Sequence, residues 1–546
     1  MIQGTRGQGP GISEAAAFDP TADRRPPTPA HERMRRLAQA ALVVLTGFLA
    51  SRVLGVVRSM VIAAHFGTGV EANAYIAAIT VPDTVFQVLV GGAVGSAFIP
   101  VFQGYLTKRQ EADAWRLTSS VINVGVLVAG GTALVLAIFA RPLMDVLVPG
   151  RDPEFRELAA SLSRILLITP AIFAASTFCA SVLNAYHRFA VAALAPLMYN
   201  LAIIGGAFFL SGPMGIHGLA IGAAVGAVLH LLIQVPALIR LGMKWQPVID
   251  FGHAGVREVA RLFAPRVLGL GVVQFNKVLS GVLFASFLVV GSMAYLDYAW
   301  LMIMTPLALA MAVGTAVFPT LSEASALEHS GQVRQVFQLS LRMILFLTIP
   351  ASVGLLVLGE PVIRLFFERN QFTAESTSAT AYALVFFAIG LAGHATVEIV
   401  DRVFYALHDT RSPVLVAVSA IGLNVVLSLV LMQTPLSYGG LALANSIAAL
   451  VEAGVLIRLV TWRLPELSLD SLSMSAVRIL AASLVMGLPV AWLGSALDGL
   501  LRPYGTPGQA VLLAICVSVG AALYGVVSLV FRSDEMHALV RLIRHR

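Results

Sequence analysis

The stretch Ala93-Val-Gly-Ser-Ala-Phe-Ile-Pro100 returns in the second half of the chain as Ala312-Val-Gly-Thr-Ala-Val-Phe-Pro319, an offset of 219 residues. Four further matches keep the same order with offsets of similar size. They begin at Arg52 and Arg266, Ala74 and Ala294, Ala185 and Ala406, and Gly218 and Gly440. The pattern indicates a duplicated unit of about 220 residues. In membrane transporters, duplication is typical of two lobes that move around a shared site.

The composition is that of a polytopic membrane protein. Only 12% of the 546 residues are charged and the mean hydropathy is +0.85, whereas soluble domains have roughly 25% charged residues. Apolar stretches of about 20 residues or more recur along the chain, and each is long enough to cross the hydrocarbon as a helix. A membrane barrel would show short alternating segments instead. We therefore expect an all-α fold.

The apolar stretches predict about fourteen transmembrane helices. They run roughly over residues 37–65, 74–106, 116–148, 155–185, 189–211, 216–241, 256–287, 292–324, 333–366, 376–407, 412–433, 438–462, 474–497 and 508–531. The repeat offset equals six spans, so both halves keep one orientation and should be related by a pseudo-two-fold axis along the membrane normal. We expect a disordered cytoplasmic tail over 1–35, six-helix lobes over 36–250 and 251–465, and two additional helices with a cytoplasmic C-terminus over 466–546.

The distribution of Lys and Arg predicts the orientation. The connections Lys108–Arg116, Arg240–Arg257 and Arg402–Arg411 are basic, whereas those near 66–73 and 288–291 carry no Lys or Arg. The positive-inside rule then places both termini in the cytoplasm. Five residues depart from this trend: Arg151, Arg156, Arg364, Arg369 and Arg502. The basic residues are scattered over loops and are not gathered on one domain. Membrane topology therefore explains the net charge of +7 better than binding to a nucleic acid does.

No enzyme motif is present: the chain lacks Gly-x-Ser-x-Gly, His-Glu-x-x-His and a P-loop. The predicted connections are mostly too short for an extramembrane catalytic domain. Cys179 and Cys516 lie inside predicted spans, where we expect small apolar packing residues rather than a disulfide or a metal pair. We therefore expect neither an enzyme nor a bound cofactor or metal.

Two arginines stand out within the first span, where charge is costly and points to function. Arg52 and Arg58 are about 9 Å apart along the helix and about 120° apart around it. Each side chain could simply snorkel to the interface or bind a backbone carbonyl. For Arg58, this structural explanation is as good as a functional one. For Arg52, near the middle of the span, we favour a cavity that holds water or an anion. The planar guanidinium suits phosphate because it can bond two oxygens at once.

The first two spans of each half carry most of the polar residues within the membrane. We predict a central cavity between spans 1, 2, 7 and 8, with the following substrate-binding residues: Arg52, Arg58, Asn73, Gln87, Arg266, Gln274, Lys277 and Asp297. Asp83 and Asn276 lie in the same spans. Lys277 and Asp297 could instead pair with each other, since buried charges are usually paired. The i, i+4 spacing of Glu398 and Arg402 predicts a structural ion pair.

Several motifs resemble the MurJ/MviN family. They are Ser51-Arg-Val-Leu-Gly-Val-Val-Arg58, Phe66-Gly67, the Ala93–Pro100 stretch, Phe367-Glu-Arg-Asn-Gln-Phe-Thr373 and Phe404-Tyr-Ala-Leu-His-Asp-Thr-Arg-Ser-Pro413. The resemblance covers roughly residues 37–530 and implies a member of the multidrug/oligosaccharidyl-lipid/polysaccharide exporter superfamily. It implies that two six-helix lobes alternate access and flip lipid II, an undecaprenyl-diphosphate-linked peptidoglycan precursor, across the cytoplasmic membrane. The last two helices would form a groove for the lipid tail.

The resemblance places two cavity arginines of the family on Arg52 and Arg58. The family's acidic residue in the second span falls on Asn73, its arginine there falls near Phe86-Gln87, and its acidic-arginine step in the eighth span falls on Trp300-Leu301. At the sodium site of some members, this chain has Asn424 but Ser280 and Ser428 at the acidic positions. The cavity would then have fewer charged residues than in the family, and Lys277 and Arg266 would substitute for the missing ones.

Three functions remain open from the sequence. The first is a lipid II flippase of the inner membrane, the second a flippase for another polyprenyl-diphosphate glycolipid, and the third a non-transporting scaffold that recruits cell-wall synthesis proteins. The expected partners are accordingly lipid II or a similar glycolipid, membrane lipids and cell-wall synthesis proteins. The intact arginines of the first span favour lipid II. The sequence leaves voltage, protons and sodium open as driving forces.

Overall fold

The structure, a computed structural model, describes residues 30–91, 93–327, 330–464, 469–533 and 535–536. Every regular element within these residues is helical, which confirms the predicted all-α class. Residues 1–29 of the tail predicted for 1–35 lie outside the described residues. The remaining residues, from Ala30 on, already belong to the first helix.

The helices of the N-terminal half are joined by short turns. They are α1 (Ala30–Phe66), α2 (Val70–Leu89), α3 (Ala93–Thr107), α4 (Glu111–Ile138), α5 (Ala140–Leu147), α6 (Pro153–Leu166), α7 (Thr169–Ala185), α8 (Phe189–Gly205), η1 (Gly206–Leu210), α9 (Ser211–Met214), α10 (Ile216–Leu232) and α11 (Val235–Arg240). Of these, η1 is a single π-helical segment that continues α8.

The second half contains fewer and longer helices. They are α12 (Ala254–Val278), η2 (Leu279–Phe284), α13 (Ser292–Ala326), α14 (Ser330–Phe367), α15 (Ala374–Ala406), α16 (Arg411–Leu431), α17 (Tyr438–Arg463), α18 (Leu469–Leu501), η3 (Arg502–Tyr504) and α19 (Gly505–Val530). Most predicted spans correspond to one of these helices or to a consecutive pair.

Twelve stretches of the described chain are long and apolar enough to cross a membrane. One of them, Asp470–Val530, contains both α18 and α19, and a shorter apolar stretch, Leu270–Phe284, covers the end of α12 and η2. Counting α18 and α19 separately and adding α12–η2 gives the fourteen spans that the sequence predicts. The chain is therefore a multi-pass membrane protein.

Local sequence explains several helix starts. Asp152 accepts a hydrogen bond from the backbone N of Phe155 at 2.7 Å and is followed by Pro153, so α6 begins with a capping side chain and a proline in its first turn. Thr373 caps α15 in the same way by accepting from the backbone N of Ser376. These caps fix where the loops that face the opposite lobe end.

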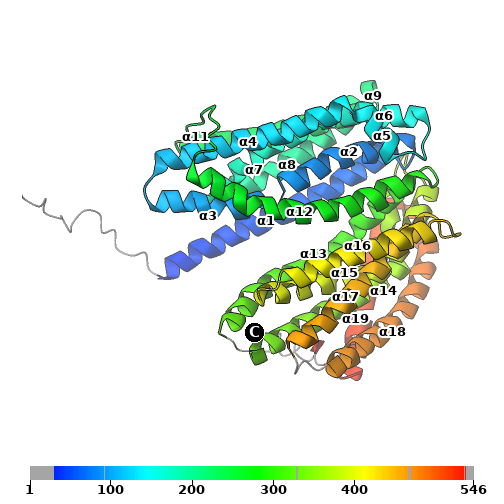
Figure 1. The fold of residues 1–546 in the computed structure, drawn as a ribbon. Coiled ribbons are helices and arrows are strands. Elements are labelled where there is room, and N and C mark those ends of the chain that lie inside the picture. Colours follow the sequence, from blue (N-terminus) through cyan, green and yellow to red (C-terminus); the bar gives the residue numbers. More distant parts are fainter. Residues whose placement is uncertain (1–29, 92, 328–329, 465–468, 534, 537–546) are drawn as a thin grey trace, which may run out of the picture.

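The helices form two groups in Figure 1. Helices α1–α11 make up the upper group, with α12 along its lower edge, and α13–α19 make up the lower group. The first turns of α12 share a buried apolar cluster with the N-terminal half, where Val256 and Val259 pack with Phe98 and Leu117. Helix α12 thus begins against the first group, and the domain boundary at 250/251 stays a prediction.

The two additional helices pack on the outside of α14. Buried side chains of α18 and α19, such as Met486 and Leu512, form an apolar cluster with Val353 of α14. The hydroxyl of Tyr524 in α19 donates to the backbone O of Phe346 at 3.0 Å. Helices α18 and α19 are therefore attached to the second group through α14.

Candidate functional site

Four charged side chains from both halves act on one another electrostatically. We call Arg58, Asp83, Lys277 and Asp297 the central cluster. The positive charges of Lys277 and Arg58 act on both carboxylates, and the charge of Asp297 acts on Asp83. The cluster joins α1, α2, α12 and α13, which correspond to the four spans expected to form the site.

Arg58 is held by a residue that the sequence analysis did not single out. Its Nη1 donates a hydrogen bond to Oδ1 of Asn200 in α8 at 3.1 Å. Its Nε is buried and has no hydrogen-bond partner among the described residues. The guanidinium is therefore positioned by one neutral partner and keeps donors for a further acceptor. The only sequence feature that could have pointed to Asn200 is that it is a lone amide in the otherwise apolar α8.

Lys277 and Asp297 do not form a direct ion pair. Both side chains are exposed, and the charge of Lys277 acts on Asp297, but no contact within 4.0 Å joins them in the described structure. Two accessible, opposite charges at this depth in apolar helices are what a wet site between the halves would require.

Arg52 has different surroundings from Arg58. Its side chain is exposed, and the guanidinium carbon lies over the ring of Phe48, 5.4 Å from its centre. It forms no hydrogen bond or ion pair with any residue in the described part of the chain. A β-carbon built on Gly55 would meet nothing within 4 Å, so α1 is open between the two arginines.

The remaining predicted site residues occupy the same helices. Gln87 is exposed at the end of α2, and Gln274 is half-buried in α12. Asn276 has a buried Oδ1 with no hydrogen-bond partner among the described residues. Arg266 lies in α12, but its side chain is outside the described part of the structure.

Asn73 is fully buried and bonds the two halves together. Its Oδ1 accepts hydrogen bonds from the backbone N atoms of Met293 and Ala294 at 3.1 and 3.3 Å, while Nδ2 donates to the carbonyls of Thr68 and Gly69. The first turn of a helix has unpaired N–H groups, and α13 has no capping side chain of its own. Asn73 of α2 therefore caps α13 from the opposite half.

Two family-like motifs meet beside Asn73. The backbone N of Gln371 donates to the backbone O of Ala64 at 3.1 Å, and the hydroxyls of Thr68 and Ser376 hydrogen-bond at 2.8 Å. We call residues 64–73, 149–151, 285–294 and 371–376 the interlobe contact. These segments lie at the same ends of their spans, so they close one end of the site.

A second set of bonds in the interlobe contact involves Arg151. Its Nη2 donates to the backbone O atoms of Ala285 and Val289 at 3.2 and 3.1 Å. The backbone of Gly150 abuts that of Ser286 so closely that a β-carbon would collide there. Buried apolar side chains of both halves, including Tyr75 and Tyr298, form one continuous cluster at this end. The contact is thus extensive.

The positions that the sequence resemblance places at a sodium site are neutral in this chain. The hydroxyls of Ser280 and Ser428 both donate to Oδ1 of Asn424, at 2.9 and 3.3 Å. Within the described residues there is no group of three or more His, Cys, Asp or Glu side chains that could hold a metal. Hard cations favour sets of oxygens that include carboxylates, so this triad is a poor cation site.

Other residues have structural roles. Arg402 and Glu398 form the predicted ion pair at 2.7 Å. Asp409 accepts from the backbone N and the hydroxyl of Ser412, and Arg463 donates to it at 2.7 Å. These hydrogen bonds and the nearby Arg463 charge lower the pKa of Asp409. Both described cysteines are free and buried.

Comparisons with known proteins agree over nearly the whole chain. Residues 62–503 match the family model described as lipid II flippase MurJ. A Haemophilus influenzae protein described as a probable lipid II flippase MurJ is 30% identical over 505 residues, covering 88% of this chain and 98% of that protein. A lipid II flippase MurJ of Burkholderia cenocepacia is 27% identical, covering 89% and 95%.

Solved structures have the same architecture. A lipid II flippase MurJ in an inward closed conformation matches with a TM-score of 0.75 at 27% identity, covering 90% of this chain and 99% of that chain. An inward-facing multidrug resistance transporter of the MATE family matches with a TM-score of 0.65 at 14% identity, covering 78% and 98%. The second likeness concerns the fold alone.

Proposed function

We propose, because this chain belongs to the MurJ lipid II flippase family, that it moves lipid II across the cytoplasmic membrane by alternating access. Family membership over most of the chain is the observation that carries the proposal. The activity is transport, in which the protein changes its own conformation and leaves the covalent structure of the substrate unchanged. The chain acts as a multi-pass protein of the inner membrane.

The orientation belongs to the proposal. The basic connections favour termini in the cytoplasm, and the interlobe contact is formed by the opposite ends of the spans. The contact would then close the site toward the outside, while the central cluster faces the cytoplasmic side where lipid II is made. This arrangement corresponds to the loading state of an alternating-access cycle.

The diphosphate of lipid II is the group that the cationic side chains would bind. Arg52 lacks an anionic partner among the described residues, and Arg58 has an unused buried donor, so both can donate hydrogen bonds to phosphate oxygens. Guanidinium groups bind such oxygens in pairs. In the absence of substrate, Asp83 and Asp297 balance the charge of Lys277. The substrate phosphate would compete with these two carboxylates for the ammonium group of Lys277.

Transport then requires the interlobe contact to open. The hydrogen bonds from Met293 and Ala294 to Asn73 are made only while the halves touch. Binding of the diphosphate to the cationic side chains of both halves would favour approach of the halves at the cytoplasmic end, and the bonds of Asn73 at the opposite end would break. We accordingly assign Asn73 to gating, whereas its role in substrate binding stays a prediction.

Two alternatives differ from this proposal in what they predict. A flippase for another polyprenyl-diphosphate glycolipid would use the same arginines with a different headgroup. A non-transporting scaffold would have its centre closed by bulky apolar residues, whereas Gln87, Lys277 and Asp297 are exposed. That exposure supports transport. Recruitment of cell-wall synthesis proteins is a separate proposal.

A complementation experiment tests the function. Cells depleted of their own lipid II flippase should regain growth and shape when this chain is expressed, but not when its Arg52→Ala variant is expressed at equal membrane abundance. Failure of the unaltered chain, at normal abundance, would favour the scaffold. Rescue limited to cells that make another polyprenyl-linked glycan would favour the second flippase.

A further inference from the structure

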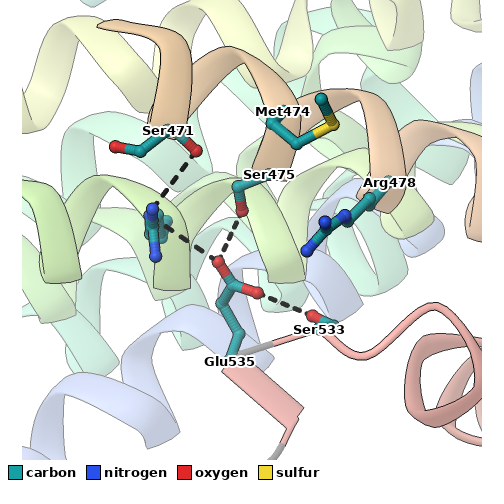
Figure 2. Close-up of a pocket in the computed structure, with 7 residues that line it drawn as sticks. Ser471, Met474, Ser475, Arg478, Ser533 and Glu535 are labelled. Atoms are coloured by element: carbon teal, nitrogen blue, oxygen red, sulfur yellow. Dashed lines mark hydrogen bonds and ion pairs between the residues drawn. The ribbon is translucent and has the colours of Figure 1, made fainter. Parts of the chain in front are cut away.

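A pocket distant from the central cluster lies between α14, the start of α18 and the segment after α19 (Figure 2). Its volume is about 200 Å³. Apart from Met474, its lining is polar and consists of Arg342, Arg478, Ser471, Ser475, Ser533 and Glu535. Three hydroxyls and two guanidinium groups around one opening are an unusual set for a membrane protein surface.

The pocket lies where apolar membrane segments end. Arg342 directly precedes the uncharged stretch 343–358 of α14, and Arg478 directly precedes the uncharged stretch 479–492 of α18. Helix α19 ends at Val530 and is followed by Arg532. Arginines at this level in α14 and α18, and just beyond the end of α19, mark the headgroup level of the bilayer. In the orientation proposed above, this headgroup level belongs to the cytoplasmic leaflet.

A carboxylate of the protein itself occupies the centre of the pocket. Glu535 accepts hydrogen bonds from the hydroxyls of Ser475 and Ser533, and its Oε1 lies 3.9 Å from Nε of Arg342. Arg342 also donates from Nη2 to the backbone O of Ser471 at 3.2 Å. The pocket therefore already binds one anion, the buried Glu535, through hydroxyl and guanidinium groups.

The second arginine adds a charge that Glu535 does not balance. Figure 2 shows the side chain of Arg478 extending from α18 toward Glu535. Arg478 is exposed and forms no hydrogen bond or ion pair with another residue in the described ranges. Among the described lining residues, two guanidinium groups and one carboxylate leave one positive charge in excess. A phosphate could contact Arg478 without displacing Glu535.

We infer that this pocket binds the phosphate of an anionic phospholipid headgroup in the leaflet that faces the chain termini. Guanidinium forks and hydroxyls are suited to phosphate oxygens, and basic pockets between transmembrane helices bind anionic headgroups. The acyl chains would lie against the apolar surfaces of α18 and α14 that begin at this level. Arg478 is the main contact, and Glu535 weakens binding by like-charge repulsion. The inference is independent of lipid II transport.

Lipid-dependent thermal stability of the purified full-length chain in neutral detergent tests the inference. Dioctanoyl phosphatidylglycerol should raise the unfolding midpoint in a saturable manner, because a ligand that binds only the folded state stabilises it. Arg478→Gln should weaken the apparent affinity about ten-fold, the effect of losing one hydrogen bond to a charged group. Glu535→Gln should strengthen it, since it removes the negative charge while the amide oxygen still accepts from one of Ser475 and Ser533 and the amide NH₂ can donate to the other hydroxyl.

Matched controls separate this site from general charge effects. Arg458 is an exposed arginine near the end of α17, and Arg458→Gln should leave the lipid response unchanged. Dioctanoyl phosphatidylcholine and inorganic phosphate should stabilise the protein much less than phosphatidylglycerol does. An equal response in Arg478→Gln and the unaltered chain, or an equal loss in Arg458→Gln, would overturn the site. Equal stabilisation by inorganic phosphate would overturn its assignment to a lipid.

Discussion

Gly67 and Gln371 approach so closely that a β-carbon on Gly67 would collide with the backbone O of Gln371. The two residues belong to motifs from opposite halves, and Gly67 itself has a left-handed backbone conformation, with a φ of +58°. A glycine is required there for both reasons. A side chain at this one position would therefore force the halves apart locally.

Gly67→Ala should open the interlobe contact. Left-handed strain at a non-glycine residue costs about 1–3 kcal/mol, before the collision with Gln371 is added, and 1–2 kcal/mol changes a two-state ratio about 5- to 30-fold. The buried Ser292, replaced by cysteine, can report opening through labelling by a membrane-impermeant thiol reagent from outside. The two natural cysteines are buried, so background labelling should be low.

Gly69→Ala is the matched control for this change. Gly69 lies two residues further on, has a φ of −74° and has nothing within 4 Å of a built β-carbon. It should label like the unaltered chain. If Gly67→Ala labelled no faster than Gly69→Ala, the interlobe contact would not be the outer gate.

Asn73→Ala should also destabilise the closed contact. It leaves the backbone N–H groups of Met293 and Ala294 without their acceptor, and a buried unpaired donor costs about 1–3 kcal/mol. Asn73→Asp keeps the acceptor and places a negative charge at the start of α13, which is favourable, but loses the donor to Thr68 and Gly69. We expect labelling of Ser292→Cys to rise most for alanine and less for aspartate. Equal labelling in both variants would contradict the proposal that Asn73 stabilises the closed contact by capping α13.

Lys277 and Asp297 should behave as a coupled pair in transport. Lys277→Met leaves two carboxylates beside Arg58 and should reduce translocation strongly, whereas adding Asp297→Asn should restore part of it. Residues that share one electrostatic network give non-additive effects. Translocation rates, normalised to membrane abundance, measure the cycle. Strictly additive losses would contradict the central cluster.

Transport should not depend on sodium. Ser280, Ser428 and Asn424 satisfy one another without a carboxylate, so the site lacks the charge that a hard cation needs. Replacing Na⁺ by K⁺ should leave the initial rate of translocation unchanged. Ser428→Asp supplies the missing carboxylate and is the informative comparison, because it should introduce sodium dependence. A sodium requirement in the unaltered chain would contradict the assignment.

The fold was predictable because lipid leaves the backbone few choices. Apolar length identifies each helix, so even α18 and α19 were expected from uncharged stretches alone. The start of α1 at Ala30 was missed because a few polar residues before an apolar run carry no membrane signal. The repeat stays a prediction: Pro100 lies in the separate helix α3, whereas Pro319 lies inside the continuous α13.

The site was predictable only in part. Polar residues in four spans pointed to α1, α2, α12 and α13, the helices that carry the central cluster, whereas binding of substrate there stays a prediction. The partner of Arg58 could not be predicted, because Asn200 is neutral and lies in an apolar helix. The role of Asn73 was also hidden, since its partners at α13 are backbone N–H groups, which leave no trace in the residue pattern.

Arg52 provides the most direct test of the account. The purified chain, reconstituted in vesicles with fluorescent lipid II in one leaflet, should transfer the lipid to the other, and Arg52→Ala should abolish transfer at equal incorporation. Arg52→Lys keeps the charge but loses the two-pronged contact, so a partial defect is expected. Transfer by Arg52→Ala at the full rate, or no transfer of lipid II by the unaltered chain, would contradict the proposal that this chain flips lipid II through a diphosphate site at Arg52.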